Sequence, residues 1–136
     1  MIGIVLITHH ELGRVLLQTA EGILGKLENC TALSVDGSSS MDQAMKEIQQ
    51  RIRSMDQGEG VLVLTDMFGG TPSNLSLSLL ESTRLEVITG ANLPMLLKIL
   101  NKREADLEEL AGEAKSAGRQ GIVVAGDVMK RKISNG

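Results

Sequence analysis

Two polar side chains that could act together follow two separate apolar runs of the sequence. His9 comes shortly after the apolar run at residues 2–7, and Asp66 comes shortly after the run at residues 61–64. Runs without polar alternation are typical of parallel strands that are covered on both faces. If these strands are neighbours in one sheet, both side chains project from its carboxyl edge, where open α/β sheets place their ligands. A carboxylate there could fix the tautomer of the imidazole.

The segment after Asp66 predicts a loop that binds an anion. Gly69 and Gly70 let the backbone approach a ligand closely or adopt a positive φ. Thr71 can cap a helix whose first residue is Pro72. The free N–H groups and the positive dipole end of such a helix attract a phosphate, and this requires no metal or other cofactor. The sequence therefore predicts that a histidine, a carboxylate and a phosphate-sized pocket meet at one edge of a sheet.

Other chemistries lack parts of their usual patterns. A hydrolase with Thr71 or Ser73 as nucleophile, His9 as base and Asp66 as orienting group is conceivable, but the chain has no nucleophile-elbow motif. It has neither the glycine-rich loop of nucleoside triphosphatases nor that of dinucleotide-binding folds. Two histidines and one cysteine do not form a zinc site of familiar spacing. A plainer alternative is that His9 is only a satisfied polar residue at the end of a strand.

Composition limits the class of protein. The 136 residues, 42% of them hydrophobic, are enough for one globular domain but not for two. A net charge of -3 and a single aromatic residue, Phe68, argue against nucleic-acid binding. The lone Cys30 permits no internal disulfide, which suits a reducing compartment. The opening apolar run is too short to span a bilayer and lacks the flanks of a signal peptide, so we expect a cytoplasmic protein.

The remaining elements alternate between strand and helix. Further strands are predicted at residues 29–35, 85–89 and 121–125, with a flexible tail over residues 128–136. Apolar residues at helical spacing predict one helix from residue 12 to Gly25 and another over residues 104–117. Three more helices are predicted to begin after a Ser40 cap, at Pro72 and after an Asn92 cap. This order indicates a single α/β domain, residues 1–136, with a mainly parallel, flavodoxin-like sheet in the order 2-1-3-4.

Two of these helices raise questions of packing. The first helix is predicted to face the sheet with its apolar residues at helical spacing, which are Leu12, Val15, Leu16, Ala20, Ile23, Leu24 and Leu27. The helix after Asn92 is nearly all apolar, so either its own domain or a second subunit must cover it.

At this point the motifs resemble a known family. Three segments resemble the EIIA component of the mannose-type family. They are Ile-Thr-His-His at residues 7–10, Thr-Asp-Met-Phe-Gly-Gly-Thr-Pro-Ser-Asn at residues 65–74 and Gly-Ala-Asn-Leu-Pro-Met at residues 90–95. This family belongs to the bacterial phosphoenolpyruvate:sugar phosphotransferase system. The resemblance covers almost the whole chain.

The resemblance implies a phosphocarrier. His9 would accept a phosphoryl group from the carrier protein HPr and pass it to an EIIB partner, while Asp66 orients the imidazole. Gly70 and Thr71, with Gly69 beside them, would hold the phosphoryl oxygens. Family members form homodimers in which the last strand, here residues 121–125, is commonly exchanged. The membrane would be involved only through the sugar permease.

Some features stay open. Many relatives have glycine at the position of His10. In this chain His10 instead places a second imidazole beside the proposed nucleophile, His9. Met67 and Phe68 are candidates for docking the partner, although Phe68 could instead cover the edge of the core. A phosphorylation-dependent regulator without onward transfer, and a phosphocarrier subunit of a dihydroxyacetone kinase, are the alternative functions. The sugar is not encoded in this chain.

Overall fold

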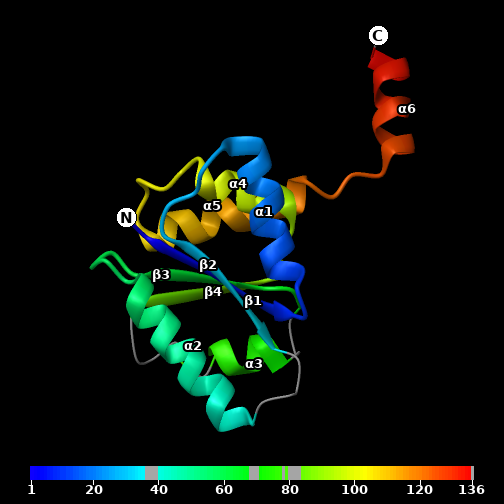
Figure 1. The fold of residues 1–136 in the computed structure, drawn as a ribbon. Helices are drawn as coiled ribbons and strands as arrows, with labels where there is room; N and C mark the ends of the chain where they lie inside the picture. The colour runs from blue at the N-terminus through cyan, green and yellow to red at the C-terminus, as the bar shows by residue number, and fades with distance from the viewer. Residues whose placement is uncertain (36–39, 68–70, 78, 80–83, 136) are drawn as a thin grey trace.

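The chain folds around a four-stranded parallel sheet with the order β2-β1-β3-β4 (Figure 1). The computed structural model describes residues 1–35, 40–67, 71–77, 79 and 84–135. The strands are β1 (Gly3–His9), β2 (Cys30–Val35), β3 (Val61–Thr65) and β4 (Leu85–Thr89). The predicted sheet order is therefore confirmed, and β1 and β3 are the two central strands.

Helices cover both faces of the sheet. Helices α1 (Leu12–Leu24), α4 (Leu93–Leu100) and α5 (Leu107–Gln120) lie on one face, and α2 (Met41–Met55) and α3 (Thr71–Leu77) lie on the other (Figure 1). Strand β3 serves both layers, because Leu62 and Leu64 pack into the first core while Val61 and Val63 pack into the second. Burial on both faces explains why this strand shows no polar alternation. Of the helices in the described residues, none combines the length and apolar character that a membrane span requires.

The helix caps follow the sequence signals. Ser40 Oγ accepts a hydrogen bond from the Gln43 N–H at 3.1 Å, and Asn92 Oδ1 accepts one from the Met95 N–H at 2.9 Å. Gly25 ends α1 with a φ of 90°, which glycine adopts without strain. The helix boundaries differ slightly from the predictions: α3 begins at Thr71 rather than Pro72, and α5 covers Leu107–Gln120 rather than residues 104–117.

The apolar helix α4 is covered by its own domain. Its buried residues Met95, Leu96 and Ile99 belong to the core under α1 and α5. Gly118 of α5 allows this packing, because a Cβ at that position would lie 2.8 Å from Met95 Cε. A second subunit is therefore not needed to cover this helix.

The first helix differs from its prediction. Leu12, Val15 and Ile23 are exposed, whereas Ala20 is buried and Leu16 is half-buried against the core. The helix carries apolar residues around most of its circumference, so spacing alone could not tell which stripe faces the sheet. The predicted face is therefore confirmed for Leu16 and Ala20 and wrong for Leu12, Val15 and Ile23.

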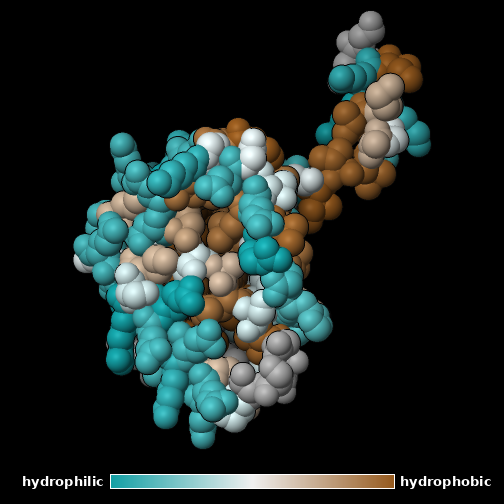
Figure 2. Space-filling model, in the orientation of Figure 1, coloured by the Kyte–Doolittle hydropathy of each residue, from teal (hydrophilic) through white to brown (hydrophobic). Residues whose placement is uncertain are grey.

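The carboxyl-terminal segment also differs. Residues 121–124 form no strand, and helix α6 (Ala125–Asn135) follows them and projects away from the body of the domain (Figure 1). A run of β-branched residues forms a strand only when it pairs with another strand. In the described part of this chain, no strand pairs with residues 121–124. The predicted fifth strand is therefore absent from the single chain. Figure 2 shows hydrophobic side chains along this arm, which exposes Ile122, Val123, Val124, Val128, Met129 and Ile133.

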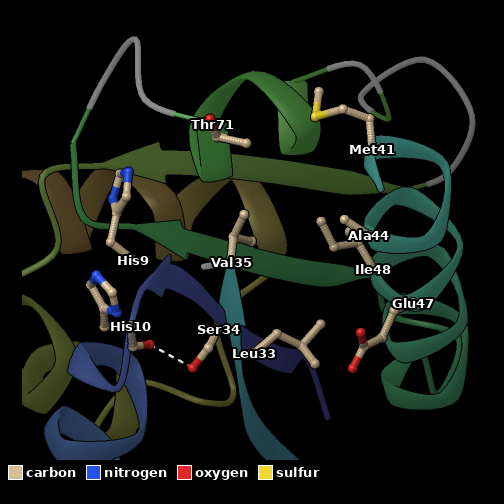
Figure 3. A pocket seen from close by; sticks show the side chains of 10 residues that line it. All are labelled: His9, His10, Leu33, Ser34, Val35, Met41, Ala44, Glu47, Ile48 and Thr71. Atoms are coloured by element: carbon tan, nitrogen blue, oxygen red, sulfur yellow. Dashed lines mark hydrogen bonds between the residues drawn. The ribbon is translucent and has the colours of Figure 1, made fainter. Parts of the chain in front are cut away.

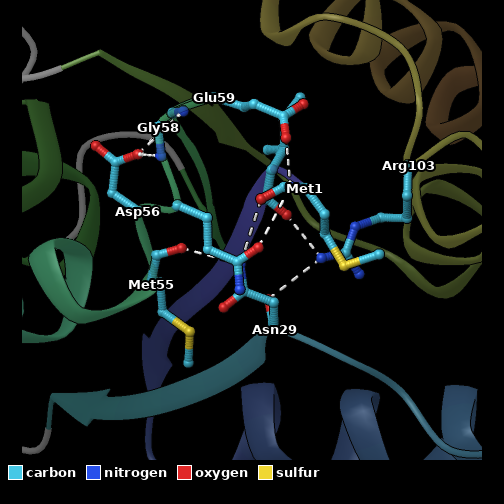
Figure 4. Close-up of polar contacts among 10 residues, drawn as sticks. Met1, Asn29, Met55, Asp56, Gly58, Glu59 and Arg103 are labelled. Carbon is cyan, nitrogen blue, oxygen red and sulfur yellow. Dashed lines mark hydrogen bonds and ion pairs between the residues drawn. The ribbon is translucent and has the colours of Figure 1, made fainter.

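A polar cluster fixes the amino edge of the sheet. Arg103 donates hydrogen bonds to the carbonyls of Ile2 at 2.6 Å and Glu28 at 2.9 Å, and Asn29 Nδ2 donates to the carbonyl of Met55 at 2.9 Å (Figure 4). Burial raises the pKa of the Cys30 thiol, although the neighbouring Arg103 partly opposes this shift. These contacts tie the starts of β1 and β2 together and leave the carboxyl edge free for the site.

Candidate functional site

The site is built where the two central strands end. The register of β1 and β3 runs from Gly3 opposite Val61 to Ile7 opposite Thr65, so His9 and Asp66 emerge beside each other. His9 Nδ1 lies 2.8 Å from Asp66 Oδ2, and the His9 backbone N–H donates to the same oxygen at 3.0 Å. The predicted meeting of these two residues is confirmed. The His9 side chain is 41% exposed and that of Asp66 is 12% exposed, so the imidazole is the more open of the two side chains.

The electrostatics of Asp66 determine the tautomer of His9. Burial raises the pKa of Asp66, but hydrogen bonds from the His9 backbone and ring together outweigh it, so the pKa lies below the usual 3.8. The Met67 N–H donates to Asp66 Oδ1 at 3.0 Å and also favours the ionised form. An ionised carboxylate can only accept hydrogen bonds, so Nδ1 of a neutral His9 carries the proton. The lone pair of the ring is then on Nε2.

His9 opens into a pocket of about 440 Å³ (Figure 3). Thr71, the first residue of α3, lines the same pocket and places a hydroxyl-bearing side chain near the start of that helix. The remaining lining residues come mainly from β2 and α2, and they are His10, Leu33, Ser34, Val35, Met41, Ala44, Glu47 and Ile48. The pocket is large enough for a phosphoryl group together with part of a larger molecule.

His10 has an unusual backbone conformation. Its φ is 47°, in the left-handed region that favours glycine, and its side chain is exposed. Its carbonyl accepts a hydrogen bond from Ser34 Oγ at 2.5 Å, which holds the turn between β1 and α1. Glycine would adopt this conformation without strain.

The other predicted site residues have different outcomes. Met67 is 55% exposed at the same edge of the sheet. Phe68, Gly69 and Gly70 lie outside the described residues, and so does the side chain of Ser73. Among the described residues, no group of three or more histidine, cysteine, aspartate or glutamate side chains is arranged to hold a metal ion.

Sequence reasoning missed the wall of the pocket. Val35 was only the last residue of the predicted strand at residues 29–35, and neither Glu47 nor Ile48 was predicted as a site residue. The register places Val35 opposite His9, which puts it beside the imidazole. The available signal was the parallel pairing of β1 with β2, since both strands end at the same edge.

Comparisons with known proteins agree with this arrangement. Residues 3–115 match the EIIA-man family, described as the PTS system fructose IIA component. The chain is 34% identical over 124 residues to the mannose-specific EIIAB component of Escherichia coli K12, covering 89% of this chain and 38% of that protein. It is 27% identical over 133 residues to the fructose-specific EIIA component of Bacillus subtilis 168, covering 96% of this chain and 91% of the relative.

A solved structure also resembles the fold. The EIIA component of the phosphotransferase system from Streptococcus agalactiae superimposes with a TM-score of 0.85 at 26% identity, over 93% of this chain and 99% of that one. The chain spans only 38% of the length of the Escherichia coli EIIAB relative. The family match nevertheless covers well over half of the present sequence. The chain therefore belongs to the mannose-type EIIA family of the phosphoenolpyruvate:sugar phosphotransferase system.

Proposed function

We propose that this protein is a phosphocarrier that accepts a phosphoryl group from phospho-HPr on Nε2 of His9 and passes it to an EIIB partner. The observation that carries this proposal is the 2.8 Å contact between His9 Nδ1 and Asp66 Oδ2. It leaves Nε2 as the nucleophilic nitrogen of a side chain that is open to solvent. Family membership supports the same role.

The proposed step is an in-line exchange between two imidazoles. The Nε2 lone pair attacks the phosphorus of the donor, the N–P bond of the donor breaks, and its electron pair returns to the donor ring nitrogen. The His9 ring becomes positively charged while Nδ1 keeps its proton, and the Asp66 carboxylate stabilises that charge. The reverse exchange delivers the phosphoryl group to EIIB.

Groups around the pocket would stabilise the phosphoryl oxygens during transfer. The Thr71 hydroxyl and the backbone N–H groups of Gly70 and Thr71, with Gly69 beside them, are the proposed donors. Losing one preorganised donor of this kind typically costs about 3–4 kcal/mol of transition-state stabilisation. Because the donor phosphohistidine is already activated, alignment and charge stabilisation account for most of the proposed catalysis.

We extend the proposal to a homodimer. Strand β4 is at the edge of the sheet, and most of it is only half-buried. The arm carries three consecutive exposed β-branched residues, Ile122, Val123 and Val124. Residues 121–125 of one protomer would pair with the open edge of the other, as the family resemblance implies, and would satisfy the backbone groups of both.

Incubation with phosphoenolpyruvate, enzyme I and HPr tests the function. We expect one acid-labile, alkali-stable phosphate per wild-type chain, none on His9→Gln and a full equivalent on the matched control His10→Gln. Onward transfer to an EIIB protein separates a carrier from a regulator. Incorporation that survives in His9→Gln and disappears in His10→Gln would refute the assignment.

A further inference from the structure

The first turn of α1 is fixed by a buried hydroxyl of the preceding strand. Thr8 is fully buried, and its Oγ1 accepts a hydrogen bond from the Gly13 N–H at 2.8 Å. Gly13 permits this close approach, because a Cβ there would lie 3.1 Å from Leu6 Cβ and 3.2 Å from Thr8 Oγ1. The N-cap residue of α1, Glu11, makes no side-chain cap hydrogen bond. Thr8 therefore caps the helix across the turn at residues 9–12.

A second hydroxyl holds the same turn from β2. Ser34 Oγ donates to the carbonyl of His10 at 2.5 Å, and it lies 3.4 Å from Glu11 Oε1 (Figure 3). The His10 carbonyl belongs to the residue whose φ is 47°. Thr8 and Ser34 are partners in the register of β1 and β2, so both hydroxyls reach the turn from one position in the sheet.

His9 depends on this turn because it lies beyond part of the sheet. The pairing of β1 with β3 ends at Ile7 opposite Thr65, whereas the pairing with β2 continues to His9 opposite Val35. A strand therefore pairs with His9 on one side only. Asp66 fixes the N–H and the ring of His9, but the carbonyl side of His9 continues directly into the turn. A shift of the turn would move Nε2 within the pocket.

We propose that Thr8 and Ser34 are positioning residues that hold the His9 imidazole in line with the phosphorus of the donor. This inference rests on the proposed function, because it concerns the same transfer step. Both hydroxyls act through the turn, and no bond to either of them forms or breaks. If Thr8 only satisfied a buried N–H group, its loss would lower stability but not the rate of transfer.

The main test replaces Thr8 by valine, which keeps the shape of the side chain and removes the acceptor of the Gly13 N–H. Transfer from phospho-HPr is followed by rapid quench. The maximal rate should fall about tenfold or more, because a small misplacement of a reacting group is costly. The KM for phospho-HPr should be unchanged, since the surface that meets the donor is intact. Thr8→Ser keeps the acceptor and should recover most of the rate.

Thr65→Val is the matched control. It makes the same replacement at a fully buried position of β3, and in the described part of the chain Thr65 Oγ1 has no hydrogen-bond partner. It should therefore transfer at the wild-type rate. Arg103→Met controls for lost stability, because Arg103 acts at the opposite edge of the sheet. Equal maximal rates for Thr8→Val and Thr65→Val, or no recovery in Thr8→Ser, would overturn the positioning role of Thr8.

Ser34→Ala tests the second hydroxyl and decides the question if Thr8→Val does not fold, since Ser34 is exposed. Its maximal rate should fall about threefold to tenfold, the equivalent of one neutral hydrogen bond. A wild-type rate would overturn the role of Ser34. The wild type tests the function separately. Normal phosphorylation of His9 with wild-type rates in the variants would refute only the positioning, whereas no transfer to the wild type would refute the phosphocarrier function itself.

Discussion

Asp66 Oδ2 accepts two hydrogen bonds from one residue, the His9 backbone N–H at 3.0 Å and the His9 ring Nδ1 at 2.8 Å. The first bond fixes the carboxylate to the strand that carries the imidazole, and the second fixes the rotation and tautomer of the ring. Strand pairing alone would leave the ring free to rotate about its side-chain bonds. The imidazole of His9 is therefore oriented before any partner arrives.

Asp66→Asn should slow phosphoryl transfer about a hundredfold or more, because an amide can donate to Nδ1 and shift the ring proton to Nε2. Rapid-quench measurement of transfer from phospho-HPr gives the rate. Asp56→Asn is the control, since Asp56 accepts the N–H groups of Gly58 and Gly60 at the opposite edge. Equal transfer rates for Asp66→Asn and wild type would contradict the orienting role.

The lowered pKa of Asp66 predicts how stability depends on pH. Its folded pKa lies below its usual value of 3.8, so the ionised group stabilises the fold above the unfolded pKa. That contribution is lost as pH falls through the folded pKa. Thermal melting from neutral to acidic pH should therefore show a stability gap between wild type and Asp66→Asn that narrows in acid. A gap that widens as pH falls would be inconsistent with this shift.

The φ of 47° at His10 predicts an order of stabilities. His10→Val should be less stable than His10→Gly by about 1–2 kcal/mol, because a β-branched residue is strained in the left-handed region. Urea unfolding measures the difference, and both variants should keep full phosphorylation of His9. Equal stability of the two variants would show that the turn relaxes out of this conformation.

The hydrogen bonds of Arg103 predict that its replacement lowers the stability of the fold without changing the rate of phosphoryl transfer. Arg103→Met removes the donors to the carbonyls of Ile2 and Glu28 and should cost about 1–3 kcal/mol. Denaturant unfolding measures this loss, while the maximal transfer rate should be unchanged because the cluster lies at the amino edge of the sheet. A fall in transfer rate for folded Arg103→Met would mean that the two edges are coupled.

The exposed arm predicts the assembly state. Val123 is 60% exposed in the single chain, and in the proposed exchanged strand it would pair across two protomers. Val123→Asp should convert a dimer into a monomer in analytical ultracentrifugation, because a charge would be placed in a paired, apolar strand. Lys130→Asp, beyond the paired segment, is the control. A monomeric wild type would refute the exchange.

Much of the fold could be predicted because local and global signals agree. The uninterrupted apolar runs of β1 and β3 predicted their central position, and the Ser40 and Asn92 caps marked two helix starts. The meeting of His9 with Asp66 followed from the rule that parallel strands end at one edge. These inferences depend on residues within one element or on a general rule of topology.

The remaining features depend on contacts that no local pattern encodes. Residues 121–124 have strand character, but no strand of the described residues lies beside them. Val15 and Ile23 fit a helical stripe, but they face outward. The positive φ of His10 is set by the turn into α1 and by the bond from Ser34. The place of Val35 in the wall of the pocket follows only once the register of β1 and β2 is known.

The most direct test of the central claim is to locate the phosphate on the phosphorylated protein. Mass spectrometry under mildly alkaline conditions identifies the residue, and nitrogen-resolved NMR identifies the ring atom. Because Asp66 holds the proton on Nδ1, the account predicts a single phosphate on Nε2 of His9. A phosphate on His10, or on Nδ1 of His9, would contradict it.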